Sequence, residues 1–412
     1  MKKRLILILC ILLMILIAVP VSAIDIVAIS GSIYRTDLDY YNHLRGEDIT
    51  LVVYNWGEYI SDGGDDSFDT NKEFEELTGI SINYITFASN EQMYAKLKSE
   101  GTSLYDIIIP SDYMIARMIR EGMVEALDFS NIPNYTLVDD LYKNLEHDRN
   151  NEFSVPYMWG LVGIIYNSSM VDEDIDSWDS FWDEQYKGNI LMFDNPRDAF
   201  AISLARLGYS MNTEDESQIE EAAEELMKQK SLVQAYVMDE IFNKMEGGEA
   251  AIAPYYAGDA ITMMSENEDL VFVFPKEKTN LFIDGFVIPK GSKNKEAAEM
   301  YINFMCEPAV SAANAEYIGY STPIPDAFEL IDIDDEDLAI AYPNEKIIAN
   351  SEVLRELNNE TNLLMDRLWT DIRSYKDGTK GWIIPTAFIL AAVIVSTLVI
   401  IRRAKKRRRD LY

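Results

Sequence analysis

The stretch from Tyr54 to Ile60, YNWGEYI, carries residues that could bind a cation, because two tyrosines, a tryptophan and a glutamate gather around one glycine. It follows the apolar run ITLVV, whose alternation is typical of a strand entering a core, and Gly57 lets the chain turn sharply there. Aromatic faces attract a cation through their quadrupole, and the Glu58 carboxylate attracts it through its charge. The same stretch is also compatible with the edge of a core beside a solvated glutamate.

Signals for catalytic or metal chemistry are weak in this chain. Its two histidines, His43 and His147, are too few and too scattered for a zinc site, and no GxxxxGK[ST] or GxGxxG run is present for a nucleotide. Paired carboxylates can cleave glycosidic bonds, which keeps a hydrolase as an alternative, but the chain has no nucleophile elbow, triad or metal motif. The adjacent Tyr255 and Tyr256 could ligate ferric ion, although such a site needs further oxygen or imidazole donors. We therefore expect a protein that binds a ligand without turnover, with no metal and no cofactor.

The elements around these residues alternate between strand and helix from residue 49 onward. Strands are expected over 49–54, 80–87 and 105–110, and helices over 70–79, 90–101 and 111–122. We expect Thr70, Asn90 and Ser111 to cap the three helices. This alternation predicts a mostly parallel sheet with helices on both faces, and such sheets bind ligands beyond the carboxyl ends of their strands. Both YNWGEY and PSDY follow strand ends, which favours the cation-binding interpretation.

A second α/β stretch runs from about Leu161 to Asp284. It contains the expected strands VGIIYN, GNILMFDN, AAIAPYYAG and LVFVFP and a helix over 214–228. The strand FIDGFVIP is followed by a helix over 293–308, and a closing amphipathic helix is expected over 351–374. The chain therefore has two α/β parts of similar kind.

The two ends of the chain carry apolar segments with basic flanks. At the start, KKR precedes an apolar run, and VSA at 21–23 offers small residues to a signal peptidase. Residues 1–23 are therefore expected to be a signal peptide, with an uncleaved anchor as the alternative. Residues 382–401 are uncharged and are followed by the basic tail 402–412, which predicts a transmembrane helix with a cytoplasmic end. A short linker, 376–381, would hold the body outside the cell and close to the membrane.

Net charge narrows the class of ligand. Without the three basic residues at 2–4 and the seven basic and one acidic residue after Ile401, 26 basic and 69 acidic residues remain, a formal charge of −43. Such a body repels nucleic acid, whose binding depends on phosphate contacts, and weakly attracts cations. Alternatively, the excess of acidic residues only keeps the protein soluble and does not indicate a cationic ligand. Cys306 is the only cysteine after residue 23, so no disulfide can form within the body.

Several stretches, taken in their order and spacing, resemble one family. They are YNWGEY, the run from Phe87 to Asp128 that contains IIIPSDY, FSVPYMWGLVGIIYN, YKGNILMFDNPRDAFAISLARLGYSMNT and IGYSTPIP. Together they are similar to the polyamine (spermidine/putrescine) binding proteins of ATP-driven importers, over roughly residues 49–375. None of these motifs is specific by itself, whereas the set is.

The resemblance implies an α/β fold of the two-lobed, type II periplasmic-binding-protein kind, extended here by a C-terminal transmembrane helix. Residues 49–161 and 285–328 would form one lobe, and residues 162–284 and 329–375 the other. Two crossing strands would join the lobes, with FIDGFVIP as one of them and Asp284 at the cleft. The ligand would be clamped between the lobes.

The resemblance also implies a set of ligand-binding residues. Carried over position by position, they are Trp56, Glu58, Tyr59, Ser111, Tyr113, Asn195, Asp198, Tyr256, Phe282, Asp284 and Tyr320. Asn195 stands where the best-known members have an acid, and Tyr256 and Phe282 stand where the family tends to have tryptophan. A late polar contact near 352–355 does not align clearly. These departures concern which polyamine is bound, not the class of ligand.

The chemistry of a polyamine fits these residue types. Its ammonium groups lose hydration on entry, and Glu58, Asp198 and Asp284 would compensate that cost with charge and hydrogen bonds. Its methylenes favour flat apolar walls, which aromatic rings provide. Alternatively, Asp198 is simply paired with the adjacent Arg197 or with another neighbouring residue.

The sequence thus predicts an extracytoplasmic, membrane-anchored solute-binding protein that captures spermidine or putrescine and delivers it to an ABC permease with a cytoplasmic ATPase. Two alternatives stay open. One is a surface-anchored polyamine sensor or adhesin without transport, and the other is a receptor for another small cation such as ferric ion.

Overall fold

The structure is a computed structural model that describes residues 34–375. The predicted signal peptide, linker, transmembrane helix and basic tail, at 1–23 and 376–412, lie outside these residues. No helix within 34–375 has both the length and the apolar character needed to cross a bilayer. Within the described residues, 34–369 belong to one compact unit that contains the whole sheet.

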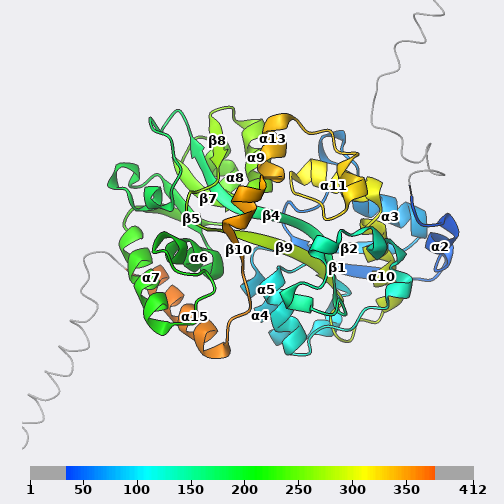
Figure 1. Ribbon diagram of the computed structural model, residues 1–412. Coiled ribbons are helices and arrows are strands. Elements are labelled where there is room, and N and C mark those ends of the chain that lie inside the picture. The colour runs from blue at the N-terminus through cyan, green and yellow to red at the C-terminus, as the bar shows by residue number, and fades with distance from the viewer. Residues whose placement is uncertain (1–33, 376–412) are drawn as a thin grey trace, which may run out of the picture. The chain divides into compact units, whose positions relative to one another are not determined.

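A ten-stranded mixed sheet organises the described unit, in the order β2-β1-β3-β9-β4-β7-β5-β6, with β10 beside β9 and β8 beside β4. The strands are β1 Thr50–Trp56, β2 Ser81–Phe87, β3 Ile107–Ile108, β4 Ser154–Asn167, β5 Ile190–Phe193, β6 Val233–Val237, β7 Ile252–Tyr256, β8 Leu270–Val273, β9 Thr279–Val287 and β10 Ser351–Val353. The helices are α2 Leu38–Asn42, α3 Thr70–Thr78, α4 Asn90–Glu100, α5 Asp112–Arg120, α6 Pro196–Arg206, α7 Glu216–Gln229, α8 Glu240–Glu246, α9 Ala257–Glu266, α10 Lys295–Met305, α11 Pro308–Ile318, α12 Pro325–Phe328, α13 Asp335–Ala341, α14 Glu345–Ala349 and α15 Asn359–Ser374. Helices cover both faces of the sheet (Figure 1).

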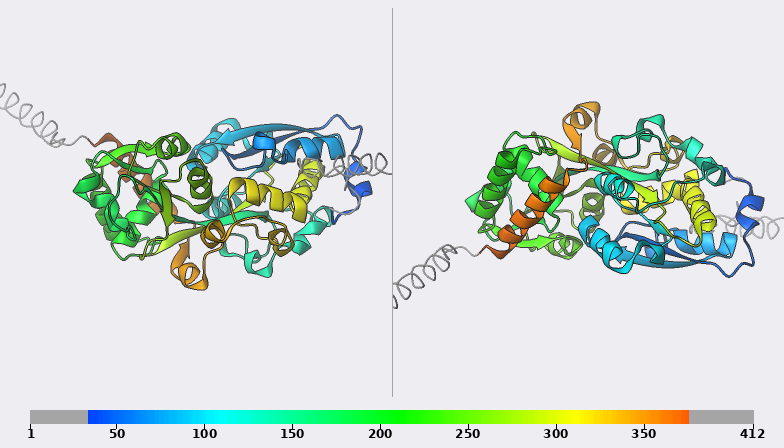
Figure 2. Two further views of the ribbon diagram at one scale, coloured as in Figure 1. Left: turned by 90° about the horizontal axis from the view of Figure 1, so that it is seen from above. Right: turned by 90° about the horizontal axis from the view of Figure 1, so that it is seen from below.

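Two central strands, β4 and β9, run antiparallel through the middle of the sheet. Their register extends from Ser154 opposite Val287 to Leu161 opposite Leu281. Strand β3 pairs with β9 on one side, and β7 pairs with β4 on the other. We call β1, β2 and β3 with α3, α4, α5, α10 and α11 the β1 half, and β5, β6 and β7 with α6, α7, α8 and α9 the β5 half. Seen from above and below, the two halves lie toward opposite ends of the central strands (Figure 2).

Strand direction confirms the predicted parallel sheet within each half but not at its centre. Strand β1 is parallel to both β2 and β3, and β5 is parallel to both β6 and β7. Strand β4 is antiparallel to β7, β8 and β9, and β3 is antiparallel to β9. The prediction of a mostly parallel sheet is therefore wrong for the central strands, because β4 and β9 pass between the halves in opposite directions.

Two predicted helix caps are each displaced by one residue. The N-cap of α3 is Asp69 and not Thr70, and the N-cap of α4 is Ser89 and not Asn90. In both cases the side chain before the predicted one accepts a hydrogen bond from a backbone N–H of the first turn. Ser111 does cap α5, although its side chain accepts no hydrogen bond there.

The predicted closing helix over 351–374 is wrong in its first part. Residues Ser351–Val353 form β10, which pairs in parallel with β9, and helix α15 begins only at Asn359. Strand β3 pairs with β9 only at Val287, so β9 has hydrogen-bonding groups left for this segment at residues 279–281, which the local sequence pattern of the segment does not reveal.

The β1 half buries apolar side chains on both faces of its sheet. Val53 belongs to a cluster that also includes residues of α10, whereas Tyr54 belongs to a second cluster with residues of α5. Successive strand residues point to opposite faces, which explains this separation. Trp56, at the end of β1, packs against both clusters. The core therefore determines where the YNWGEY stretch leaves the sheet.

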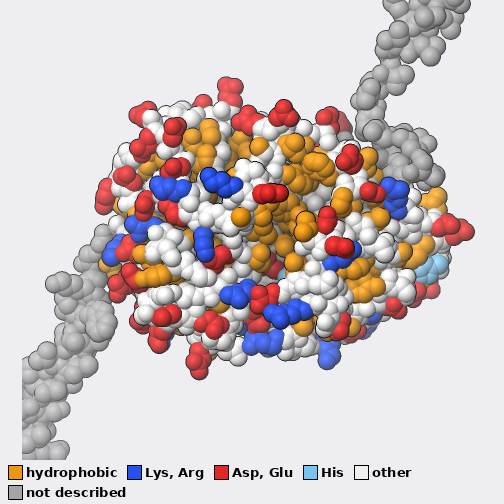
Figure 3. Space-filling model, in the orientation of Figure 1, with side chains coloured by type: hydrophobic (Ala, Val, Ile, Leu, Met, Phe, Trp, Pro, Cys, Tyr) orange, Lys and Arg blue, Asp and Glu red, His pale blue; other side chains and the backbone are white. Residues whose placement is uncertain are grey.

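Acidic side chains are spread over the face of the molecule seen in Figure 3. Such a distribution fits an acidic surface that keeps the protein soluble. A specific cation site has to be sought in a cavity.

Candidate functional site

Four strand ends converge on one cavity between the two halves. Trp56 ends β1, Ser111 follows β3 at the start of α5, Asn195 follows β5 at the start of α6, and Tyr256 ends β7. Carboxyl ends of parallel strands are where α/β sheets bind ligands. The residues at these ends line a narrow space that we call the enclosed cavity.

The structure brings ten of the eleven predicted ligand-binding residues together around the enclosed cavity. They are Trp56, Tyr59, Ser111, Tyr113, Asn195, Asp198, Tyr256, Phe282, Asp284 and Tyr320. The cavity has a volume of ≈ 50 Å³, far below the roughly 300 Å³ or more of a typical ligand pocket. So narrow a space suits a thin, unbranched ligand.

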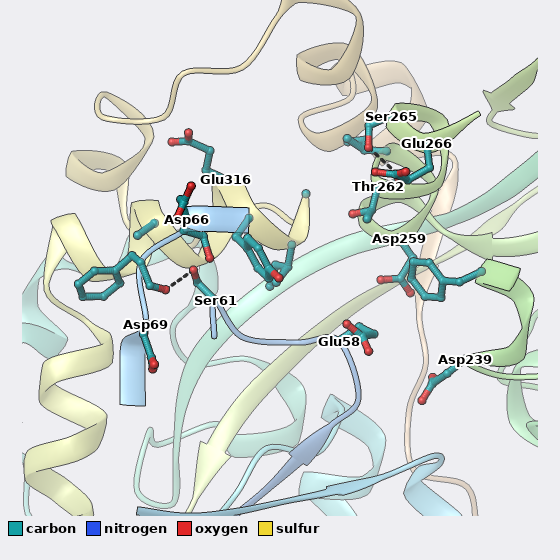
Figure 4. A pocket seen from close by; sticks show the side chains of 18 of the residues that line it. Glu58, Ser61, Asp66, Asp69, Asp239, Asp259, Thr262, Ser265, Glu266 and Glu316 are labelled. Atoms are coloured by element: carbon teal, nitrogen blue, oxygen red, sulfur yellow. Dashed lines mark hydrogen bonds between the residues drawn. The ribbon is translucent and has the colours of Figure 1, made fainter. Parts of the chain in front are cut away.

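Glu58, the eleventh predicted residue, lies outside the enclosed cavity. It lines a larger neighbouring space of ≈ 1510 Å³, which we call the outer pocket (Figure 4). Its backbone is left-handed, with a φ of 45°, and turns the chain after Gly57. The two spaces share Met238, Asp239 and Asp259 and are therefore neighbours.

Asp284 offers an unused hydrogen-bond acceptor to the enclosed cavity. Its side chain is 4% exposed, and its Oδ1 atom has no hydrogen-bond partner among the described residues. Burial raises the pKa of Asp284 to about 7, although the hydroxyl groups of Ser111 and Tyr59 act to lower it. A buried, unsatisfied carboxylate oxygen carries a free-energy cost that a ligand N–H donor would remove.

Asp198 is the second buried carboxylate of the cavity. It accepts hydrogen bonds from the Asn195 amide at 2.6 Å, from the Tyr256 hydroxyl at 2.8 Å and from the Asn280 amide at 3.4 Å. Burial raises its pKa to about 6, while the Tyr256 hydroxyl, the charge of Arg197 and the Asn280 amide act to lower it. No described ion pair joins Arg197 to Asp198. The guanidinium instead donates to the Met211 carbonyl at 2.7 Å and to the Asn212 side chain.

Asn195, which replaces an acid of the resembled family, is engaged within its own helix terminus. Its side-chain oxygen accepts from the backbone N–H groups of Arg197 and Asp198 and caps α6. Its amide donates to the Asp198 carboxylate. The residue therefore organises Asp198 and supplies no negative charge of its own.

Aromatic rings form a continuous wall along the enclosed cavity. The Tyr320 ring packs edge-on against Tyr59, with 4.9 Å between centroids, and against Phe282, with 5.9 Å. Phe282 lies in turn 5.3 Å from Tyr256. These rings provide flat apolar surface and faces that attract a cation.

Two further cavity residues were missed by sequence reasoning although a signal for each existed. Asn280 precedes Phe282 by two residues and Asp284 by four, so the alternation of strand β9 places all three on one face. Asp259 lies three residues after Tyr256, in the first turn of α9. Both therefore follow from elements that were already predicted.

Asp112 is a positioning residue whose role only the tertiary structure reveals. Its carboxylate accepts hydrogen bonds from the Ile283 N–H at 3.1 Å and from the Tyr113 N–H at 2.6 Å. Burial raises the pKa of Asp112 well above its usual range. These contacts tie the start of α5 to β9 beside Asp284 and thereby fix both sides of the cavity.

The segment near 352–355 lies away from the enclosed cavity. Glu352 forms an ion pair with Lys278, and Arg355 forms one with Glu146. Neither Glu352 nor Arg355 lines the enclosed cavity.

The charged side chains that line the enclosed cavity are all acidic. None of the described residues that line it is Lys, Arg or His. The acids that line it are Asp112, Asp198, Asp239, Asp259 and Asp284. A narrow, ring-walled space with buried carboxylates can compensate the desolvation of ammonium groups on a thin apolar chain.

The sequence is similar to those of known proteins. Residues 70–341 match the family of bacterial extracellular solute-binding proteins. The chain is 37% identical to the spermidine/putrescine-binding periplasmic protein of Escherichia coli (strain K12) over 304 residues, which are 74% of this chain and 86% of that protein.

Two solved structures are similar to this chain in both sequence and fold. A structure from Listeria monocytogenes, assigned to a spermidine/putrescine ABC transporter, has 38% identity and a TM-score of 0.75. The spermidine/putrescine ABC transporter substrate-binding protein of Streptococcus pneumoniae has 39% identity and a TM-score of 0.66. Each comparison covers 79% of this chain and 99% of the solved chain. This chain shares their α/β periplasmic-binding-protein fold.

Proposed function

This chain belongs to the bacterial extracellular solute-binding proteins, and we propose that it captures the polyamines spermidine and putrescine and delivers them to an ABC permease. The observation that carries the proposal is the unpartnered Oδ1 atom of buried Asp284 in a narrow cavity walled by aromatic rings. An ammonium group donates the missing hydrogen bond and supplies the opposite charge, while its methylene chain lies along the rings.

The inner ligand site consists of two carboxylates and their supporting groups. Asp284 and Asp198 each hold an ammonium group. Ser111 and Asn195 orient these acids, because the Ser111 hydroxyl lies beside Asp284 and the Asn195 amide donates to Asp198. The walls are formed by Trp56, Tyr59, Tyr113, Tyr256, Phe282 and Tyr320.

Residues 49–161 with 285–328 form one lobe in this proposal, and residues 162–284 with 329–375 form the other. The antiparallel pair β4 and β9 supports the division, because it runs between the β1 half and the β5 half. The small volume of the enclosed cavity supports a clamp that opens to admit ligand and closes around it. Closure then couples ligand contacts to docking on the permease.

Isothermal titration of the full-length protein with putrescine and spermidine tests the proposed function. We expect saturable binding of both amines and no consumption of either. Butane-1,4-diol, which has the length of putrescine but no charge, serves as the matched control and should give no binding heat. Chemical conversion of the amine would favour an enzyme, and absence of binding would contradict the proposal.

The apolar segment 382–401 anchors the protein to the cytoplasmic membrane, with the body outside and the tail 402–412 inside. Support comes from the sequence, which places twenty uncharged residues before a basic tail. Anchoring keeps the receptor close to its permease and raises its effective concentration there.

Deletion of residues 382–412 should therefore reduce polyamine uptake by cells at low external polyamine and have little effect at saturating polyamine. Uptake of radiolabelled putrescine at both concentrations measures this difference. Equal uptake by truncated and intact protein at low polyamine would contradict the anchoring role. Unchanged uptake after removal of the whole protein would instead favour a sensor without transport.

A further inference from the structure

A third space, which we call the side groove, is largely separate from the enclosed cavity and the outer pocket. Residues of α4 and α5 line one side of it, and residues from the start of α6, from the segment after β10 and from α15 line the other. Among the described residues, only Tyr113 lines both the side groove and the enclosed cavity. The groove has a volume of ≈ 490 Å³, within the range of roughly 300–1,000 Å³ that is typical of small-molecule sites.

The side groove differs from the other two spaces in its charge. Its basic side chains are Lys98, Arg117, Arg197 and Arg355. Its acidic side chains are Glu91, Glu356 and Asp366. Among the described residues, no basic side chain lines the enclosed cavity, and only Lys72 lines the outer pocket. In a chain with a formal net charge of −34, the side groove is therefore the space that can accept an anionic group.

Arg197 offers an unused hydrogen-bond donor to the side groove. The residue is 5% exposed, and its Nη1 and Nη2 atoms donate to the Met211 carbonyl at 2.7 Å and to the Asn212 side chain at 2.8 Å. Its Nε atom has no hydrogen-bond partner among the described residues. A buried N–H group without an acceptor carries a free-energy cost, and a carboxylate oxygen from a ligand would remove that cost.

Glu91 offers an unused acceptor to the same groove. Its Oε1 atom accepts a hydrogen bond from the Tyr113 hydroxyl at 3.0 Å, whereas its Oε2 atom is buried and has no partner among the described residues. Burial lowers the pKa of Arg197, and the charge of Glu91 acts in the opposite direction, so the two groups lie within electrostatic range. No described ion pair joins them. An unused donor and an unused acceptor of opposite charge therefore line one space.

The remaining surface of the side groove is partly apolar. Tyr94 and Ala95 of α4 contribute to it, as do Pro196, Leu357 and Met365 from the other side. Such surface favours an aliphatic group over a further charge.

We propose that the side groove binds a small zwitterion, namely an α-amino acid with an aliphatic side chain. The ammonium group donates to Oε2 of Glu91, the carboxylate accepts from Nε of Arg197, and the aliphatic side chain lies along Leu357 and Met365. Glu91 belongs to the β1 half and Arg197 to the β5 half, so the bound amino acid joins the two halves. The site does not depend on the proposed function of the enclosed cavity.

Isothermal titration of the full-length protein with L-leucine at pH 8 tests the side groove. This pH keeps Glu91 ionised, since burial raises its pKa to about 7. We expect saturable binding that excess putrescine does not weaken. Two analogues are the ligand controls: 3-methylbutylamine lacks the carboxylate of leucine, and 4-methylpentanoate lacks its ammonium group. In the presence of excess putrescine, each should bind at least about tenfold more weakly than leucine, because one charge-assisted hydrogen bond is lost.

Two substitutions locate the bound leucine. Glu91→Gln should weaken leucine binding about tenfold or more, because the charge that holds the ammonium group is removed. Ala95→Trp should abolish binding by filling the groove from an exposed position of α4, and it keeps the test valid if Glu91→Gln unfolds in a thermal melt. Gln92→Trp is the matched control, because Gln92 is exposed on the same helix but does not line the groove. It should change leucine affinity less than twofold.

Absence of leucine binding to the unmodified protein would overturn the proposal and leave the side groove a solvent-filled gap. Displacement of leucine by putrescine, equal affinity for either analogue, or unchanged leucine affinity in a folded Ala95→Trp protein would overturn it as well. The proposed function is judged separately, by whether the unmodified protein binds putrescine and spermidine.

Discussion

Replacement of Asp284 by asparagine is expected to weaken putrescine and spermidine binding by about 30-fold or more at pH 8. Asparagine keeps the size of the side chain but removes the charge that compensates the desolvated ammonium group. Loss of one partner of a buried charged pair costs about 2–5 kcal/mol, which corresponds to this change or a larger one. Isothermal titration of the two proteins measures the difference directly.

Thermal unfolding of the ligand-free Asp284→Asn variant should be unchanged or shifted to higher temperature. In the free protein the carboxylate is 4% exposed with one oxygen unpartnered, so its charge opposes folding. Asp332→Asn is the matched control, because Asp332 is exposed and lines neither the enclosed cavity nor the outer pocket. Unaltered polyamine affinity in a folded Asp284→Asn protein would remove Asp284 from the site.

Polyamine affinity should fall steeply as the pH is lowered from 8 to 5. Burial raises the pKa of Asp284 to about 7 and that of Asp198 to about 6 in the free protein, whereas a bound ammonium group lowers both. Binding is therefore strongest above the free-state pKa values and is lost as the pH falls through them. The ligand amines keep their charge over this range, as Lys does with a pKa of ≈ 10.4.

The expected size of the pH effect follows from linkage. Protonation of Asp284 alone lowers the affinity about 100-fold between pH 8 and pH 5, and protonation of Asp198 contributes about another tenfold. Titrations across this range should therefore show a decrease approaching three orders of magnitude for the unmodified protein. Asp284→Asn should retain only about a tenfold decrease. A flat profile, or tighter binding at low pH, would contradict a site built on ionised carboxylates.

Most residues that line the enclosed cavity could be predicted from the sequence to lie close together, because they lie at the ends of recognisable elements. Trp56 and Ser111 follow strands whose apolar alternation is a local property, and Asp284 lies in a strand that can be read in the same way. The order of these stretches also carried the resemblance to polyamine-binding proteins. The acidic composition and net negative charge indicated a positively charged ligand.

The sequence did not determine which hydrogen bonds each of these side chains makes or which cavity it lines, since both depend on contacts between elements that are distant in the chain. The Asn195 side chain already caps α6 and donates a hydrogen bond to Asp198. Compared with the acid found at this position in the resembled family, it therefore lacks the negative charge and has no polar group left to bind a ligand. Glu58 lies in the outer pocket and not in the enclosed cavity, because the left-handed turn after Gly57 carries it there.

The sequence by itself determined the strands and most of the helices, because their periods of two and of 3.6 residues depend only on residues close together in the chain. It also determined which aromatic and acidic residues lie at the ends of these elements. Only the tertiary structure decided which of those residues share a space. Two antiparallel central strands bring the β1 half and the β5 half face to face, so that Asp239 of one half meets Gly57 of the other. That approach joins residues almost two hundred positions apart in the chain, and no local period encodes it.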